Sequence, residues 1–158
     1  MGKLSYLICI WGSTSRENLR ALQVTQNRAA RYVTRDWTAG TVANLRAIGW
    51  LSVTQLAFYH TVLLMFKIKQ IRSSEKIVAP EYLVKMFNWE YSYATRQADG
   101  NMIKPHGIPR LDVTKRGLRY RAADFFNQLP AVLRQEKSIE TFKFKAKEWI
   151  RGNIRARP

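Results

Sequence analysis

The segment from residue 52 to residue 72 carries the longest run of helical periodicity in the chain, and this run constrains the fold most strongly. Ser52 and Gln55 have the spacing of a capping box, in which two side chains satisfy backbone groups at the start of a helix. Behind them, apolar residues recur at intervals of three and four: Leu56, Tyr59, Leu63, Phe66 and Ile71. The pattern predicts one long amphipathic helix, the longest in the chain.

Two more helices are predicted in the N-terminal part of the chain. Thr14 and Glu17 also have capping-box spacing and begin the first of them. Its apolar face is predicted to consist of Leu19, Leu22, Gln26, Ala29 and Val33. A short helix is predicted over residues 41–48, because Gly49 stops it. The opening residues 4–11 fit the period of a strand as well as that of a buried helix.

Helical signals return in the second half of the chain. Pro80 fits the first turn of a helix that runs to Phe87. Thr114 is predicted to cap a helix that ends near Gln128, and Ser138 to cap the last helix. The inward-facing residues of these last two helices are predicted to be Leu118, Ala122, Phe125 and Phe126, then Ile139, Phe142, Ala146, Trp149 and Ile150.

Residues 88–114 separate the two sets of helices and predict a long loop. Its helix-breaking residues are Gly100, Pro105, Gly107 and Pro109. A small hairpin inside this loop is an open alternative. The chain is therefore predicted to be a single, mainly α domain of about five or six helices over residues 1–158, with N-terminal helices in 1–87 and C-terminal helices in 115–158.

The charge balance indicates the kind of partner. Lys and Arg number 27 against 11 Asp and Glu, which gives a formal net charge of +16. So large an excess repels itself within a compact fold unless a polyanion neutralises it, so RNA or DNA is the first expected partner. An anionic membrane surface is the second.

The scarcity of metal ligands and acidic pairs argues against several enzyme classes. Cys9 is the only cysteine, and His60 and His106 are the only histidines, so no disulfide and no ordinary zinc site is expected. No two acidic residues are adjacent, and no catalytic, metal-binding or cofactor-binding residue is predicted. His60 lies on the apolar-rich helix and is interpreted as a core or boundary residue.

The longest apolar run in the middle of the chain, Val62–Phe66, is too short to span a bilayer. An intracellular location, nuclear or cytoplasmic, is expected.

Basic residues gather in three clusters that are candidates for phosphate binding. The first cluster lies on the first long helix and consists of Arg20, Asn27, Arg28, Arg31 and Arg35. An arginine stripe suits phosphate because the guanidinium fork binds two oxygens at once. The alternative is a solvated helix face.

The second cluster begins the helix expected after the long loop and consists of Lys115, Arg116, Arg119 and Arg121. Cations at a helix N-terminus oppose its dipole, and an external phosphate would resolve this conflict. The third cluster lies in the last helix and the tail, and it consists of Lys143, Lys145, Lys147, Arg151, Arg155 and Arg157. For this third cluster a solvated face is an equal alternative.

Aromatic residues precede a further arginine in the loop. Trp89, Tyr91 and Tyr93 come before Arg96, a mixture that can stack unpaired bases. A hairpin packed against the core is the alternative use of the same residues.

Several segments also resemble those of a known protein family in their amino-acid sequence. The first carries Tyr6, Ile8, Ile10, Trp11, Gly12, Leu19, Leu22, Gln23, Gln26, Asn27, Arg28, Ala29, Ala30 and Arg31. Later segments add Gly49, Trp50, Leu51, Gln55, Lys67, Tyr93, Thr95, Arg96, Gly100, Arg119, Tyr120, Arg121, Ala122, Ala123, Asn127, Leu129, Pro130, Phe142, Lys143, Lys147 and Trp149. In order and spacing, the chain resembles the segment that follows the polymerase core in jockey-like non-LTR retrotransposon reverse transcriptases.

The resemblance implies a parent protein that copies RNA into DNA with Mg²⁺ as its metal. The paired Asp of that polymerase has no counterpart here, so the chain is expected to be a nucleic-acid-binding fragment without catalysis of its own. The resemblance places the fingers and palm before Met1, which makes Met1 an internal start and the missing polymerase core a possible partner. Two alternatives stay open: a purely structural relic of the element and a basic peripheral membrane protein.

Overall fold

The computed structural model describes residues 5, 7–73, 80–87, 89, 102–104, 111 and 117–153. These residues confirm the predicted mainly helical fold. The helices are α2 (Ile8–Trp11), α3 (Arg16–Thr34), α4 (Thr41–Ala47), α5 (Val53–Arg72), α6 (Glu81–Lys85), α9 (Leu118–Gln128), α10 (Ala131–Arg134) and α11 (Ile139–Asn153). The expected loop and hairpin of residues 88–114 lie almost entirely outside the described residues.

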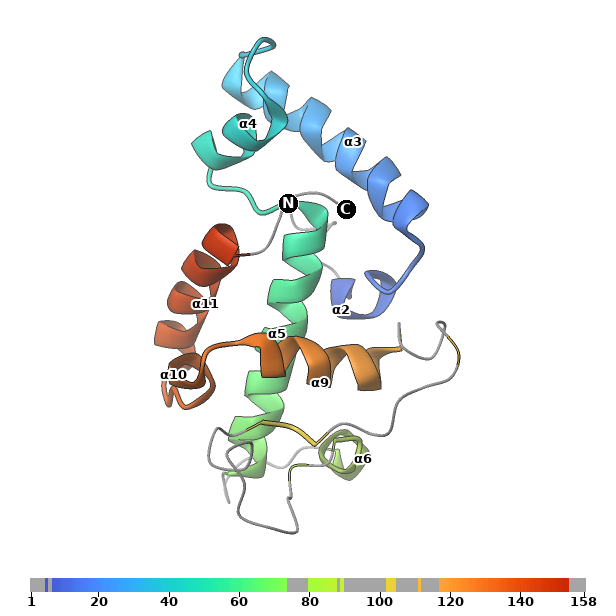
Figure 1. Cartoon of the computed structure of the whole chain (residues 1–158), viewed down its shortest axis with the longest axis vertical. Coiled ribbons are helices and arrows are strands. Elements are labelled where there is room, and N and C mark those ends of the chain that lie inside the picture. Colours follow the sequence, from blue (N-terminus) through green and yellow to red (C-terminus); the bar gives the residue numbers. More distant parts are fainter. Residues whose placement is uncertain are drawn as a thin grey trace.

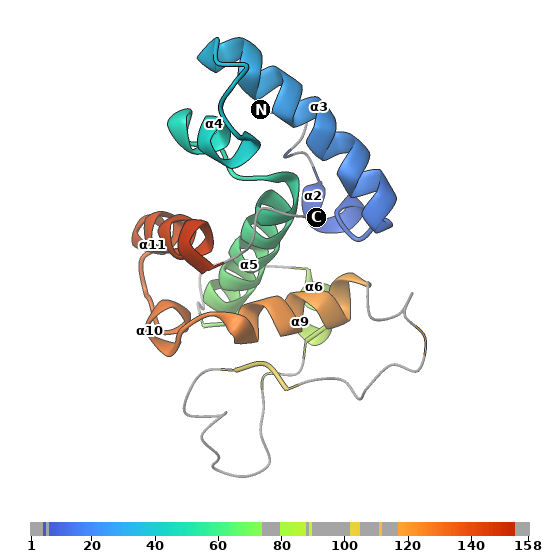
Figure 2. The same cartoon turned by 45° about the horizontal axis from the view of Figure 1, so that its top comes forward.

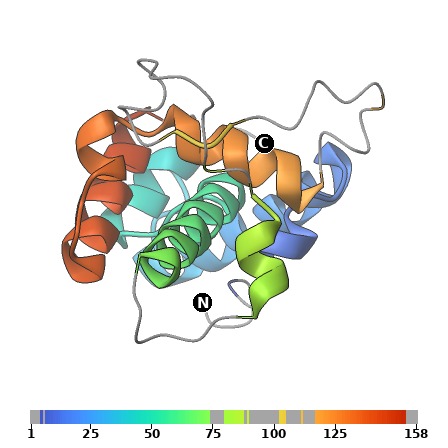
Figure 3. The same ribbon diagram turned by 90° about the horizontal axis from the view of Figure 1, so that it is seen from below.

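Helix α5 is the centre of the molecule. It runs through the middle, α9 crosses it, α11 lies along one side, and α3 and α4 occupy the end near its first residue (Figure 1). Seen from below, α11, α9, α6 and α2 surround α5 (Figure 3). Because several helices cover it, α5 buries residues well beyond a single stripe: Val53, Gln55, Ala57, Phe58, Thr61, Val62, Met65, Phe66 and Ile68.

The predicted capping box of α5 is confirmed in both of its arms. Gln55 donates its backbone N–H to Ser52 Oγ at 3.2 Å, and the Ser52 N–H donates to Gln55 Oε1 at 3.0 Å. Both residues are buried, so the box supplies partners that water does not. The start of α5 is therefore defined by its own sequence.

The main hydrophobic core lies between α5, α9 and α11. Phe66 and Phe142 are fully buried and stack with ring centroids 4.0 Å apart. Phe58 stacks on Phe125 at 4.6 Å, so α9 is fixed to α5 in the same way. The inward faces predicted for α9 and α11 are confirmed, with Ala122, Phe126, Phe142, Ala146 and Ile150 buried and Leu118, Phe125, Ile139 and Trp149 partly buried against the core.

Helix α3 is rotated relative to its predicted apolar face. Its buried residues are Gln23, Gln26 and Ala30, whereas Ala29 and Val33, predicted to face inward, are exposed. The physical reason is that the two glutamine side chains bond to the start of α5, and these bonds decide which face turns inward.

Several helix boundaries differ from the predicted ones. Ser15, not Thr14, caps α3 by accepting from the Asn18 N–H, while Thr14 accepts from the Asn18 side chain. Helix α4 ends at Ala47 with Ile48 as its C-cap, and the predicted stop residue Gly49 follows with a φ of 68°. Ser138 accepts from a backbone N–H at the start of α11, as predicted.

Among the remaining helices, α9 ends at Gln128 as predicted, and other ends differ from the prediction. Helix α6 is shorter than predicted, and its N-cap is Pro80. Helix α9 begins after Gly117, and the predicted cap Thr114 lies outside the described residues. The short helix α10 was not predicted, and the ambiguous opening segment contains α2.

Candidate nucleic-acid interface

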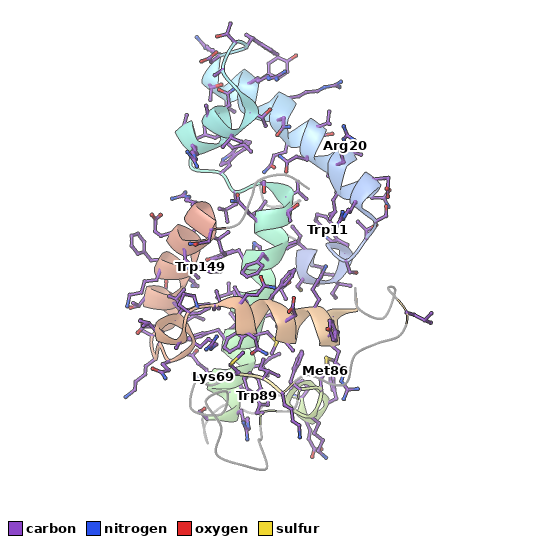
Figure 4. The ribbon with its side chains drawn as sticks, viewed as in Figure 1. Trp11, Arg20, Lys69, Met86, Trp89 and Trp149 are labelled. Atoms are coloured by element: carbon purple, nitrogen blue, oxygen red, sulfur yellow. The ribbon has the colours of Figure 1, made fainter. Side chains whose placement is uncertain are left out.

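Helix α3 lies at the top of the view in Figure 2, above α5 and α9, and its sequence contains a row of arginines. At 3.6 residues per turn they fall within about a third of the helix circumference. They are Arg16, Arg20, Arg28, Arg31 and, at the C-cap, Arg35, which together are called the α3 arginine face below. Figure 4 places Arg20 far from Lys69, Met86 and Trp89 at the other end of the molecule. Arg16 was missed in the sequence, although it stands four residues before Arg20 on the same side.

No described carboxylate neutralises the α3 arginine face. Among the described residues, no ion pair or hydrogen bond joins these five guanidinium groups to another side chain. Arg31 is half-buried, and its Nε is buried without a hydrogen-bond partner. A buried donor without a partner carries a cost in stability.

Asp36, which follows the row directly, is engaged in a turn. Its Oδ1 accepts from the Ala39 N–H at 2.8 Å and from the Thr38 N–H and hydroxyl at 2.9 Å each. These bonds, the Ala39 one first, hold the pKa of the Asp36 carboxyl below its ordinary value. The carboxylate therefore organises the connection to α4.

A buried amide cluster holds the arginine face in place. The Gln23 side chain donates to Gln26 Oε1 at 2.9 Å and to Asn27 Oδ1 at 2.7 Å. Gln23 Oε1 accepts from the Val53 N–H, and Gln26 donates to the Leu51 carbonyl, both at 2.8 Å. Asn27, which was predicted to contact nucleic acid, contributes its side-chain carbonyl to this cluster. The cluster joins α3 to the first turn of α5.

Arg35 occupies a backbone position that favours glycine. Its φ of 55° and ψ of 21° lie in the left-handed region at the end of α3. For a residue with a Cβ this conformation costs about 1 kcal/mol. The exposed side chain makes no contact in the described structure that offsets this cost.

Replacing Arg35 with glycine is expected to raise the free energy of unfolding by about 1 kcal/mol, because the left-handed strain disappears. Arg35→Ala is the matched control, since it loses the charge but keeps a Cβ, and it should not stabilise the fold. Thermal unfolding of both variants tests this; equal unfolding temperatures for the two would contradict it.

The second predicted cluster is only partly at the surface. Arg121 is buried, its Nη2 donates to the Cys9 carbonyl, and its guanidinium lies over Phe125 at 5.7 Å. Burial, more than any other cause, lowers the pKa of this guanidinium. Arg121 therefore fastens α9 to the α2 segment and is removed from the candidate surface.

The rest of that cluster offers little described surface. Arg119 is exposed, but its Nε donates to the Met86 carbonyl at 2.9 Å. Lys115, Arg116 and the loop residue Arg96 lie outside the described residues.

Three residues of the third predicted cluster are paired with glutamates on α11 or just before it. Lys143 pairs with Glu140 at 2.8 Å. Lys145 pairs with Glu136 at 2.7 Å. Arg151 pairs with Glu148 at 2.7 Å and also donates to the Gly49 carbonyl. Lys147 is half-buried, and Arg155 and Arg157 lie outside the described residues. A solvated helix face therefore describes this third cluster better than it describes the α3 arginine face.

No family model, curated protein or solved structure matches the chain. The resemblance to reverse transcriptases therefore stays a prediction. The charged side chains themselves are the basis on which a function can be assigned.

In the described part of the chain, no group of three or more His, Cys, Asp and Glu side chains is placed to hold a metal ion. His60 is half-buried beside Tyr59, and burial first and Lys67 second lower the pKa of its imidazole. None of the helices described is both long and apolar enough to cross a membrane.

Proposed function

We propose that this chain binds nucleic acid through the α3 arginine face, as a segment of a retrotransposon reverse transcriptase that has no polymerase active site of its own. The observation that carries the binding proposal is the set of five guanidinium groups on one side of α3 without a described anionic partner. Four cations on other helices, Lys85, Lys143, Lys145 and Arg151, are paired with glutamates, whereas the described structure gives none of the five arginines of this face such a partner.

The chemistry of the face fits phosphate. Arginine keeps its charge at every physiological pH, and its planar fork binds two phosphate oxygens together. The side chains repel one another along the helix, and a bound polyanion relieves this repulsion while releasing its own counterions. The amide cluster behind the face keeps α3 in place, so little ordering cost is added on binding.

The test is the salt dependence of binding to RNA and DNA, measured by fluorescence anisotropy. Arg28→Gln together with Arg31→Gln is expected to reduce the slope of log affinity against log salt by about 2. Lys143→Gln together with Lys145→Gln is the matched control, because it removes the same charge from lysines that are already paired. Equal losses in the two variants would assign binding to net charge alone, and affinity that does not respond to salt would contradict the proposal.

The parentage of the chain has a test of its own. Sequencing the transcript and the genomic DNA upstream of the Met1 codon is expected to reveal an in-frame polymerase core with an Asp pair. A transcript that starts just before Met1, without such a core upstream, would contradict the reverse-transcriptase part of the proposal and leave the binding part standing.

A packing role is the second candidate, and the exposed apolar residues of α3 favour it. Val24 is 45% exposed on the side of the arginine face, and Val33 is 59% exposed on the opposite side of the helix. In this second role, one of these two sides of α3 contacts the polymerase core. The test is to measure nucleic-acid binding by the chain alone and in the presence of the polymerase core. A chain that binds the polymerase core but has no nucleic-acid affinity by itself would favour the packing role over the first candidate.

A further inference from the structure

Two exposed aromatic residues stand at the C-terminal end of the α3 arginine face. Tyr32 is 71% exposed and Trp37 is 56% exposed. Their rings meet edge to face, with centroids 4.9 Å apart and an interplanar angle of 85°. This Tyr32–Trp37 pair was not singled out in the sequence, because Tyr32 and Trp37 carry no stacking motif or periodic signal.

The pair differs from the other tryptophans of the chain. Trp11, Trp50, Trp89 and Trp149 are all half-buried, and Trp89 and Trp149 pack against the main core. Trp37 instead keeps more than half of its surface in solvent. In an edge-to-face pair, the ring that contributes its edge keeps both faces clear of its partner, so a face is open for stacking.

Arginines surround the pair on the same helix. Arg28 stands one turn before Tyr32, and Arg31 and Arg35 are its near neighbours in sequence. None of these three guanidinium groups has an anionic partner among the described residues. Sites for single-stranded nucleic acid combine exposed aromatic rings, on which bases stack, with cations that bind the phosphate backbone.

We infer that the C-terminal end of α3 binds an unpaired stretch of nucleic acid, with a base stacked on the Tyr32–Trp37 pair and the neighbouring phosphates held by Arg28, Arg31 and Arg35. The inference rests on the proposed function and deepens it by naming the substrate class. A duplex keeps its bases stacked inside, so it reaches only the arginines, whereas a single strand reaches both groups. Charge complementarity selects a polyanion over an apolar protein partner as the occupant.

The test compares binding of oligothymidylate with binding of a blunt DNA duplex of equal length. Trp37→Ala is expected to weaken binding of the single strand about tenfold and to leave duplex affinity unchanged. Trp37→Phe should recover most of the lost affinity, because a stacking face returns. Tyr82→Ala is the matched control, since Tyr82 is a 66% exposed tyrosine on α6, away from the arginine face.

Fluorescence supplies a second readout. Oligothymidylate is expected to quench the tryptophan emission of the unmodified protein and to quench that of Trp37→Phe much less, because the other tryptophans are half-buried. Circular dichroism melts of Trp37→Ala verify that the fold is intact.

The outcomes separate this inference from the proposed function. Binding that depends on Arg28 and Arg31 but loses nothing in Trp37→Ala overturns the stacking site and leaves the proposed function standing. Equal losses on single strand and duplex in Trp37→Ala also overturn it. Absence of all nucleic-acid binding overturns both. A dimer in sedimentation that Trp37→Ala dissociates, with no change in single-strand affinity, assigns the pair to a second copy of the chain and overturns the inference.

Discussion

Replacing Phe142 with alanine is expected to lower the free energy of unfolding by about 4 kcal/mol, the largest single effect that the core predicts. Phe142 is fully buried, and its ring stacks on Phe66 with centroids 4.0 Å apart and planes 14° apart. The truncation removes the apolar surface of a whole ring, the stacking contact and the contact that holds α11 on α5. Urea unfolding followed by circular dichroism measures the loss.

The same helix offers a matched control for that change. Phe144 lies two residues later and is 71% exposed. Phe144→Ala removes the same ring from an exposed position, so it should change the free energy of unfolding by less than about 0.5 kcal/mol. Should Phe142→Ala fail to fold, Phe142→Leu keeps most of the volume and is expected to cost about 1.5 kcal/mol. Equal stabilities of the two alanine variants would contradict the placement of α11.

Replacing Gln26 with leucine is expected to cost about 3 kcal/mol, although it makes the helix more apolar. The Gln26 amide donates to the Leu51 carbonyl at 2.8 Å, and its oxygen accepts from Gln23 at 2.9 Å. Leucine fills a similar volume but leaves the buried Leu51 carbonyl without this donor and removes an acceptor from Gln23. The cost therefore comes from desolvated polar groups and not from a cavity.

A glutamine at the surface provides the control for the amide cluster. Gln128 is exposed, and its side chain donates to the Asp124 carboxylate in its own helix, so Gln128→Leu should be within about 0.5 kcal/mol of the parent. Thermal unfolding of both variants makes the comparison. A Gln26→Leu protein as stable as the Gln128→Leu protein would contradict the role of the cluster in fixing α3.

Most of the helical elements could be predicted from the sequence, because their signals are local. The Ser52–Gln55 capping box and the stop at Gly49 depend on residues within one turn of each other. The stripes of α9 and α11 are apolar enough that burying them outweighs any other arrangement. The short α10 was missed, since four residues carry no periodic signal.

The orientation of α3 could not be predicted in this way. The predicted inward face included Gln26 and Val33 but not Gln23, whereas the structure buries Gln23 and Gln26 and leaves Val33 exposed. The glutamines are buried because their partners, the Leu51 carbonyl and the Val53 N–H, come from a segment 25 to 30 residues away. A hydrophobic pattern contains no information about such distant partners.

The candidate site was likewise predictable from the sequence only in part. Net charge and arginine spacing along the sequence determined that α3 carries a basic face, since the helix period alone brings residues three and four apart together. Only the tertiary structure decided that Arg121 is buried against the Cys9 carbonyl, that Lys143 and Lys145 are paired, and that Tyr32 and Trp37 stand exposed beside unpaired arginines. The physical reason is that charge and periodicity are properties of the chain, whereas burial and pairing depend on which distant groups the fold brings within hydrogen-bond distance.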